Sequence, residues 1–129
     1  MSERIPISPP SVGLETTPDA IDIGTLPALL PSWRRSLRAA NKAPRTIETY
    51  MLAAEQLVAF FMQQGMPMRA ESVRREHVET FIAHVLDTRS ASTARQRHGS
   101  LLQLWKWLEE EGEIAKSPMA KMSPPKVPE

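Results

Sequence analysis

Apolar residues recur at spacings of three and four in four separate segments of this 129-residue chain. Such spacing places apolar side chains on one side of an α-helix, whereas a half-buried strand would alternate apolar and polar residues, and no stretch of five residues does so. The segments run over about Leu26–Asn41, Pro44–Gln64, Arg74–Asp87 and Ser92–Glu111. The sequence therefore predicts an all-α fold, a compact four-helix bundle without a sheet.

Helix-breaking and capping residues mark the ends of these segments. Regular turns of the first helix are expected to start near Pro31, because prolines restrict where a helix can begin. Pro44 suits the first turn of the second helix, and Gly65 is expected to end it. Either Ser90 or Ser92 is expected to cap the fourth helix.

The two ends of the chain differ from its middle in composition. Residues 1–25 contain four prolines and no helical period, which predicts a disordered leader. Residues 117–129 also contain four prolines and suit a linker better than a packed element. The foldable domain is accordingly expected to span residues 26–116.

Composition excludes several classes of protein. The chain has no cysteine, so it has no disulfide scaffold, thiolate zinc site or cysteine nucleophile. No apolar run reaches the roughly 18 residues of a membrane span, and the N-terminus lacks the apolar core of a secretory signal. A cytoplasmic location is therefore the default. The three histidines have no metal-ligand spacing, and no cofactor is implied.

Charge is unevenly distributed along the chain. Residues 1–25 carry a net charge of −3, residues 26–108 carry +6, and acidic residues return at Glu109–Glu111 and Glu113. A basic middle favours nucleic acid as a partner, because lysine and arginine displace the counterions of phosphates. Proteins that bind no nucleic acid share such an imbalance, so charge alone does not decide the function.

Three motifs occur in a characteristic order. Pro44-Arg45-Thr46 with Tyr50 opens the second helix, Ser92-Thr93-Ala94-Arg95-Gln96-Arg97-His98 leads into a leucine- and tryptophan-rich helix, and Gly112-Glu113-Ile114 precedes Ser117-Pro118. In this order and spacing, residues 26–124 resemble the SAM-like core-binding domain of phage integrases and other tyrosine recombinases. One departure is Ser117, where asparagine is commoner in that family.

The resemblance implies a SAM-like bundle with orthogonally packed helices that holds DNA. In that family a catalytic domain with a tyrosine nucleophile follows the linker, whereas this sequence ends at Glu129. Tyr50 lies in the wrong context to be that nucleophile. We therefore expect a fragment that is not itself an enzyme, from a parent that exchanges DNA strands.

The start of the second helix is one candidate DNA-binding site. Arg45 and Thr46 lie in the first turn, where unpaired backbone N–H groups and the helix dipole favour a phosphate, and Lys42 precedes them. Tyr50 follows one turn later and has a hydroxyl for the same purpose. In the alternative interpretation Thr46 only caps the helix, Arg45 is solvated, and Tyr50 is a half-buried core residue.

The fourth helix is the stronger candidate. Thr93, Gln96, Arg97 and Ser100 share one side of it, away from the leucines and tryptophan of the apolar side. Arginine reads guanine and glutamine reads adenine in the major groove, and the resemblance places this helix at the groove. The residues expected to contact DNA here are Thr93, Arg95, Gln96, Arg97 and Lys106. Alternatively, these residues form an ordinary solvated face.

Two functions remain open. The first is a DNA-binding module that holds one side of a recombination half-site, with double-stranded DNA, the catalytic domain of the same parent chain and further recombinase protomers as partners. It requires the polar side of the fourth helix, Arg97 included, to face outward. The second is a helical protein–protein interaction module with an exposed apolar patch and no role with nucleic acid. An independent enzyme is excluded, because no acid, base and nucleophile cluster together.

Overall fold

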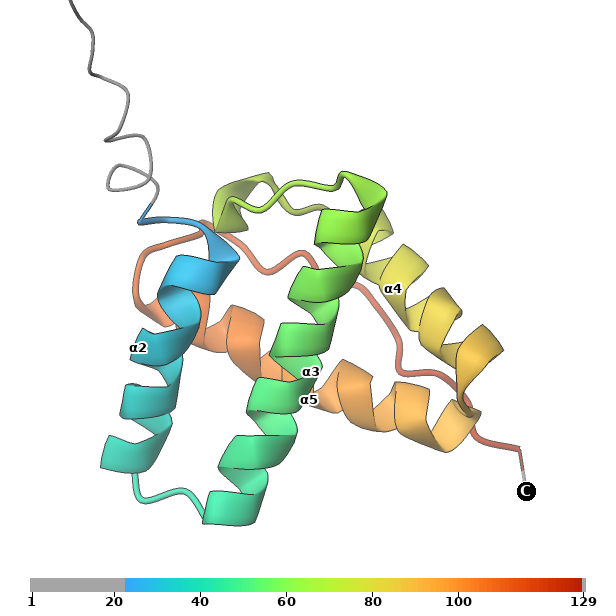
Figure 1. Ribbon diagram of the computed structural model, residues 1–129, viewed down its shortest axis with the longest axis horizontal. Helices are drawn as coiled ribbons and strands as arrows, with labels where there is room; N and C mark the ends of the chain where they lie inside the picture. The colour runs from blue at the N-terminus through green and yellow to red at the C-terminus, as the bar shows by residue number, and fades with distance from the viewer. Residues whose placement is uncertain (1–22, 129) are drawn as a thin grey trace, which may run out of the picture.

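The computed structural model describes residues 23–128, and within them the fold is all-α. Four helices follow one another, with a short 3-10 turn before the third (Figure 1). Their bounds are α2 Leu26–Ala39, α3 Pro44–Gln64, η3 Ala70–Ser72, α4 Arg75–Thr88 and α5 Ala91–Glu110. In this described part of the chain β structure is limited to an isolated bridge between Thr25 and Arg69. The predicted all-α class is confirmed, whereas the predicted disordered leader lies mostly in residues 1–22, outside the described residues.

The helix ends follow local signals with one exception. Gly65 ends α3 in the left-handed conformation with φ 68°, as predicted, and the Ser90 hydroxyl caps α5 by accepting a hydrogen bond from the Thr93 amide at 3.0 Å. The expected start of the first helix near Pro31 is wrong, because α2 begins at Leu26. Pro27 lies in the first turn, where proline suits a helix, and the amide of the fully buried Leu26 donates to the Met68 carbonyl at 2.8 Å.

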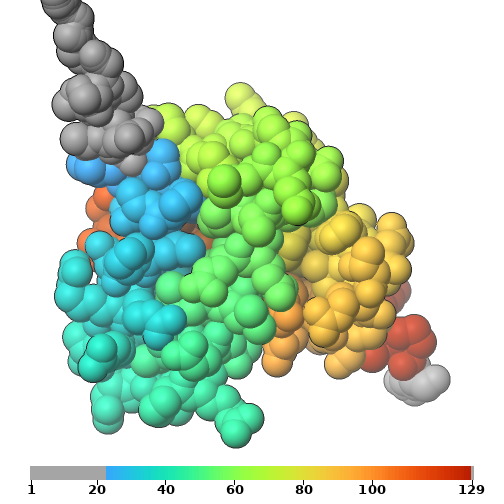
Figure 2. Space-filling model, viewed as in Figure 1, coloured from blue at the N-terminus to red at the C-terminus, as the bar shows by residue number. Residues whose placement is uncertain are grey.

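Helix α3 is the centre of the bundle and packs against each of the other three helices. Figure 1 shows α2 and α3 running antiparallel beside each other, with α5 crossing behind both of them. The N-terminal half of α5 lies on the side of α4, and its C-terminal half lies behind α2. Figure 2, in the same view, shows that α2, α3 and α4 form most of the face that is turned toward the viewer.

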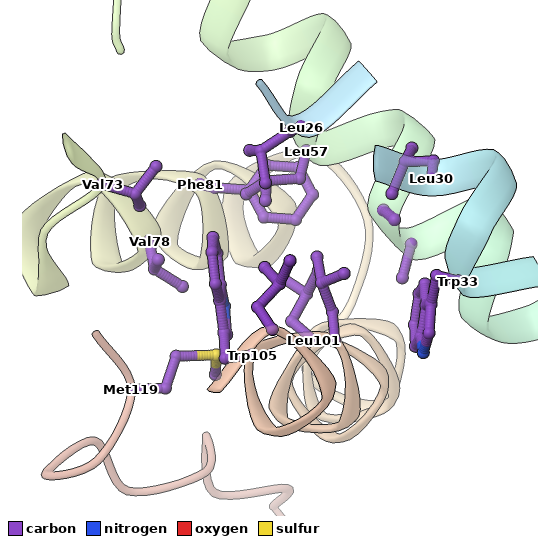
Figure 3. Packing of buried hydrophobic residues seen from close by; sticks show 14 of the residues in the cluster. Leu26, Leu30, Trp33, Leu57, Val73, Val78, Phe81, Leu101, Trp105 and Met119 are labelled. Atoms are coloured by element: carbon purple, nitrogen blue, oxygen red, sulfur yellow. The ribbon is translucent and has the colours of Figure 1, made fainter. Parts of the chain in front are cut away.

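The core gathers the apolar sides of all four helices. Its largest fully buried side chains include Trp33 of α2, Phe61 of α3 and Trp105 of α5. Figure 3 shows Trp105 and Leu101 of α5 pointing into the space between the other helices. Burial of such side chains supplies most of the free energy that stabilises a bundle of this size. No helix among the described residues is long and apolar enough to cross a membrane.

Packing continues past residue 116, where the domain was expected to end. Met119 is only 1% exposed, and Figure 3 shows it reaching from the C-terminal segment toward Trp105. Met122 packs partly against the same core, and the carbonyl of Pro125 accepts a hydrogen bond from Arg95 at 3.1 Å. The expectation that this segment has no packed element is therefore wrong. Proline-rich composition predicts the absence of helix, but it does not prevent a single methionine from filling an apolar gap.

Candidate nucleic-acid interface

The α2–α3 joint forms a basic hollow. Arg34 and Arg38 of α2 and Lys42 of the connecting loop line a concavity of about 400 Å³. Asn41, also in its lining, adopts a left-handed conformation with φ 59°, which turns the chain sharply between the two helices. Among the lining residues Glu48 alone is acidic, and it pairs with Arg34 at 3.0 Å. Lys42 is therefore placed among further cations, which sequence analysis had not grouped with it.

The first turn of α3 adjoins this hollow. Arg45 is exposed and Thr46 is half-buried. The alternative interpretation of Thr46 as the cap is wrong, because Ala43 is the N-cap and no side chain caps the helix. The first backbone N–H groups of α3 are thus left without a side-chain partner, next to the exposed Arg45.

Tyr50 belongs to the packing of the bundle. Its ring is half-buried and stacks on Trp33, with ring centroids 5.7 Å apart and planes inclined by 4°. Tyr50 also packs against the buried core cluster. The structure therefore gives the ring of Tyr50 the core contact that the alternative interpretation expected.

Arg97 does not face outward, so this prediction is wrong. The residue is only 4% exposed, and Ser100 on the same side of α5 is equally buried. The Arg97 Nε donates to Gln56 Oε1 of α3 at 2.8 Å, and its Nη1 donates to Gln96 Oε1 at 3.0 Å. Helical periodicity predicted correctly which residues share a side of α5. It could not predict that α3 covers part of that side.

Arg97 is a buried cation without a carboxylate partner. Among the described residues, none of the ion pairs involves Arg97. Burial, and to a smaller extent the positive charge of Arg89, lowers the pKa of Arg97 from its ordinary value. A guanidinium nevertheless stays charged at neutral pH. The charge of Arg97 is therefore balanced only by the dipoles of two amide groups.

The remaining predicted residues of α5 differ in exposure. Arg95, Gln96 and Lys106 are exposed. Thr93 is half-buried, and its hydroxyl oxygen accepts a hydrogen bond from the Ser90 hydroxyl at 3.0 Å. Arg95 donates to the Pro125 carbonyl, a neutral group that leaves its charge uncompensated. Arg95 and Lys106 lie two residues before and nine residues after Arg97, which places both of them on the other side of α5 from Arg97.

Sequence analysis missed Gln56 and Arg89 as members of this site. Gln56 is a polar residue between buried Ala53 and Leu57 on α3, and this interruption of an apolar pattern was the available signal. Arg89 directly precedes the cap Ser90, and its position at the α5 N-terminus could have been read from the sequence.

One side of α3 connects the two basic regions. Arg45 and Gln56 are 11 residues apart, about three helical turns, so they lie on the same side of α3. Their separation along the axis is roughly 16 Å, comparable with the width of a DNA major groove at about 12 Å. Gln56 contacts Arg97, where α5 crosses behind α3 (Figure 1). The hollow at the α2–α3 joint and the crossing with α5 thus lie at two points along one side of α3, with the exposed Leu52 between them.

The histidines contribute packing and capping. His98 is buried on α5 and its Nε2 has no hydrogen-bond partner. His77 Nδ1 accepts a hydrogen bond from the Arg74 amide at 2.9 Å, at the start of α4. No group of three or more potential metal ligands occurs within residues 23–128.

Comparison with known families identifies the class of this fold. Residues 29–112, more than half of the chain, match the model of the phage integrase N-terminal SAM-like domain. The chain therefore belongs to this family, which confirms the resemblance found in its motifs. Comparisons with curated proteins and with solved structures give no match.

Proposed function

We propose that this chain is a DNA-binding module of a site-specific tyrosine recombinase and holds one side of a recombination half-site. Membership of the integrase family supports a recombination-related role. The observation that carries the proposal is the basic hollow at the α2–α3 joint, lined by Arg34, Arg38 and Lys42, with the exposed Arg45 beside it. Backbone phosphates supply most of the affinity in such complexes, and this hollow offers the cations they need.

Because Arg97 is buried, the outward-facing Arg97 that the DNA-binding hypothesis required is given up, and the proposal now depends on the residues that remain accessible. Lys42 and Arg45 lie at the α2–α3 joint, and Arg95, Gln96 and Lys106 lie on α5. Thr46, Tyr50 and Thr93 are half-buried, and Arg97 is buried. The acidic C-terminal end of α5 would repel a duplex, so we place Glu109–Glu111 away from DNA.

The proposal extends to partners. A catalytic domain in the same parent chain would hold the opposite side of the duplex and cleave it, and further recombinase protomers would assemble on the same DNA. The natural setting is the cytoplasm. Because affinity is shared between linked domains, the isolated module is expected to bind weakly.

Salt-dependent binding tests this function. Fluorescence anisotropy with a labelled duplex should show affinity falling steeply between about 50 and 200 mM salt, since bound phosphates release counterions. Replacing both Lys42 and Arg45 by alanine should reduce the log–log salt slope by about two. The matched control is Lys116→Ala with Lys121→Ala, which removes the same charge near the α4 N-terminus and should leave the slope unchanged. Affinity that does not vary with salt would contradict the proposal.

An apolar hollow favours the second candidate, a protein-interaction module. It lies between α2 and α3, has a volume of about 500 Å³, and is lined by Leu30, Met51 and Val58, among others. Met62 at its edge is 66% exposed. Met62→Lys should leave DNA affinity unchanged under the leading proposal. Loss of a protein partner in that variant, with no measurable DNA binding by the unaltered chain, would favour the second candidate.

A further inference from the structure

We propose that Gln56, Gln96 and Arg97 form a site for a single backbone phosphate of the bound DNA. This inference rests on the proposed function and names the chemical group that the crossing of α3 and α5 recognises. Arg97 Nε donates to Gln56 Oε1 across the helix crossing at 2.8 Å, and Arg97 Nη1 donates to Gln96 Oε1 at 3.0 Å.

The orientation of both amides follows from the chemistry of the guanidinium. Arginine carries only hydrogen-bond donors, so each amide must turn its oxygen toward Arg97. The Nε2 groups of Gln56 and Gln96 therefore point their two donors each away from the guanidinium. Gln96 is exposed and Gln56 is half-buried, so these donors lie at the surface above a buried cation.

The groups that this cluster leaves free for a ligand are hydrogen-bond donors, so they favour a ligand that accepts hydrogen bonds. Adenine offers one donor and one acceptor to a bidentate glutamine, but the acceptor of Gln96 is already engaged by Arg97. Bidentate contact with adenine would make Gln96 Oε1 accept from adenine and Arg97 together, whereas a phosphate needs only the free Nε2 donors. A phosphate oxygen is an acceptor without a donor, and it matches the Nε2 groups of both glutamines.

The positive charge of Arg97 also favours an anionic ligand. Arg97 is buried and no carboxylate of the described residues pairs with it. The charge of Arg89 acts on Arg97 and adds positive potential. Attraction between charges grows as the local dielectric falls, so a cation only 4% exposed attracts an anion at the site more strongly than a solvated one does. An incoming phosphate supplies the negative charge that the fold leaves out.

The test replaces each glutamine by its nearly isosteric acid. Gln56→Glu and Gln96→Glu place a carboxylate on Arg97 and remove the outward donors. The matched control is Gln64→Glu, the same charge change at the exposed C-terminal end of the same helix α3. Affinity for two duplexes of unrelated sequence is measured by anisotropy over a range of salt, and the melting temperature of each variant is measured without DNA.

We expect the substitutions to keep or raise the stability of the fold and to lower the affinity for DNA. The melting temperature of Gln56→Glu should equal or exceed that of the unaltered chain, because Arg97 gains a charged partner. The Kd should rise about tenfold or more on both duplexes, as for loss of a hydrogen bond to a charged group, and the salt slope should fall by about one. Gln64→Glu should change the Kd by less than about twofold, as expected for a distant surface residue.

Three outcomes would overturn the inference. A Kd for the Gln56 and Gln96 variants equal to that of Gln64→Glu would remove the phosphate site while leaving the proposed function intact. A loss of affinity on one duplex only would assign the cluster to a base edge instead of a phosphate. Absence of salt-dependent binding by the unaltered chain would overturn the proposed function, and the inference with it.

Discussion

Two arginines contact the same helix in opposite ways. Arg34 of α2 reaches Glu48 of α3 at 3.0 Å, and both side chains are exposed, at 38% and 70%. Arg97 of α5 reaches Gln56, eight residues further along α3, at 2.8 Å, and it is only 4% exposed. Helix α3 thus gives a carboxylate to the solvated arginine and a neutral amide to the buried one.

The difference between the two arginines shows where this bundle keeps a positive charge that can still bind an anion. A solvated ion pair is screened by water and salt and contributes little to stability. A buried pair of full charges would neutralise itself, whereas an amide satisfies the hydrogen bonds of Arg97 and leaves its positive charge in place. The exposed pair therefore fits a surface contact, and the buried cluster fits a site that awaits an anion.

Truncation of Arg97 should give the largest effect, and truncation of Arg34 a much smaller one. Arg97→Ala should lower the free energy of unfolding by about 2–3 kcal/mol, because it removes buried packing of the side-chain stem and two charge-assisted hydrogen bonds. Arg34→Ala should cost at most about 1 kcal/mol, as expected for an exposed pair. Urea denaturation of both variants measures these values. Equal losses would break the comparison.

Double-mutant cycles measure the coupling energy of each arginine with its partner on α3, which is expected to be smaller than the full cost of truncating Arg97. The coupling between Arg97 and Gln56 is expected at about 1.5–3 kcal/mol and should persist in 1 M salt, because water and ions have little access to it. The coupling between Arg34 and Glu48 is expected at about 0.2–1 kcal/mol in low salt and should vanish at 1 M, where the screening length is about 3 Å. A buried coupling that disappears in high salt would show that Arg97 is solvated after all.

The smallest expected effect is a dependence of the free energy of unfolding on pH, which is absent at neutral pH. Burial, and then the charge of Arg95, lowers the pKa of His98 below its ordinary value of 6.5. Between that value and the lower folded-state pKa the unfolded chain binds the proton more readily. The free energy of unfolding should therefore be constant above about pH 6.5 and fall as the pH drops below it.

Urea denaturation between pH 7.5 and 5 measures this dependence. His98→Phe should lose the part of the acid dependence that His98 causes, whereas the exposed His84→Gln, the matched control, should retain it. A His98→Phe variant with unchanged acid sensitivity would mean that His98 titrates as it does in water.

Sequence analysis predicted the helices closely where the signals were local. The bounds of α3 agree at both ends, since Pro44 and Gly65 act on the backbone of their own residues. The start of α2 was placed too late, because the contact of Leu26 with Met68 joins residues far apart in the chain. Met119 was missed for the same reason.

Prediction of the site was partial for a related cause. Periodicity placed Gln96 and Arg97 correctly on one polar side of α5, yet it assigned Arg97 to the solvent. The partner that buries Arg97 is Gln56, 41 residues earlier in the chain. Gln56 interrupts the apolar pattern of α3, which indicates a polar partner in the bundle, but the sequence does not identify that partner as Arg97.

The sequence by itself determined four amphipathic helices, their capping and stop residues, and the family that shares their motifs. These properties depend on backbone preferences and spacings within one helical turn or a few turns. Only the tertiary structure decided which polar side chains stay in water and which are covered. The crossing of α3 over α5 depends on how two apolar surfaces fit together, and that fit is a property of the whole bundle.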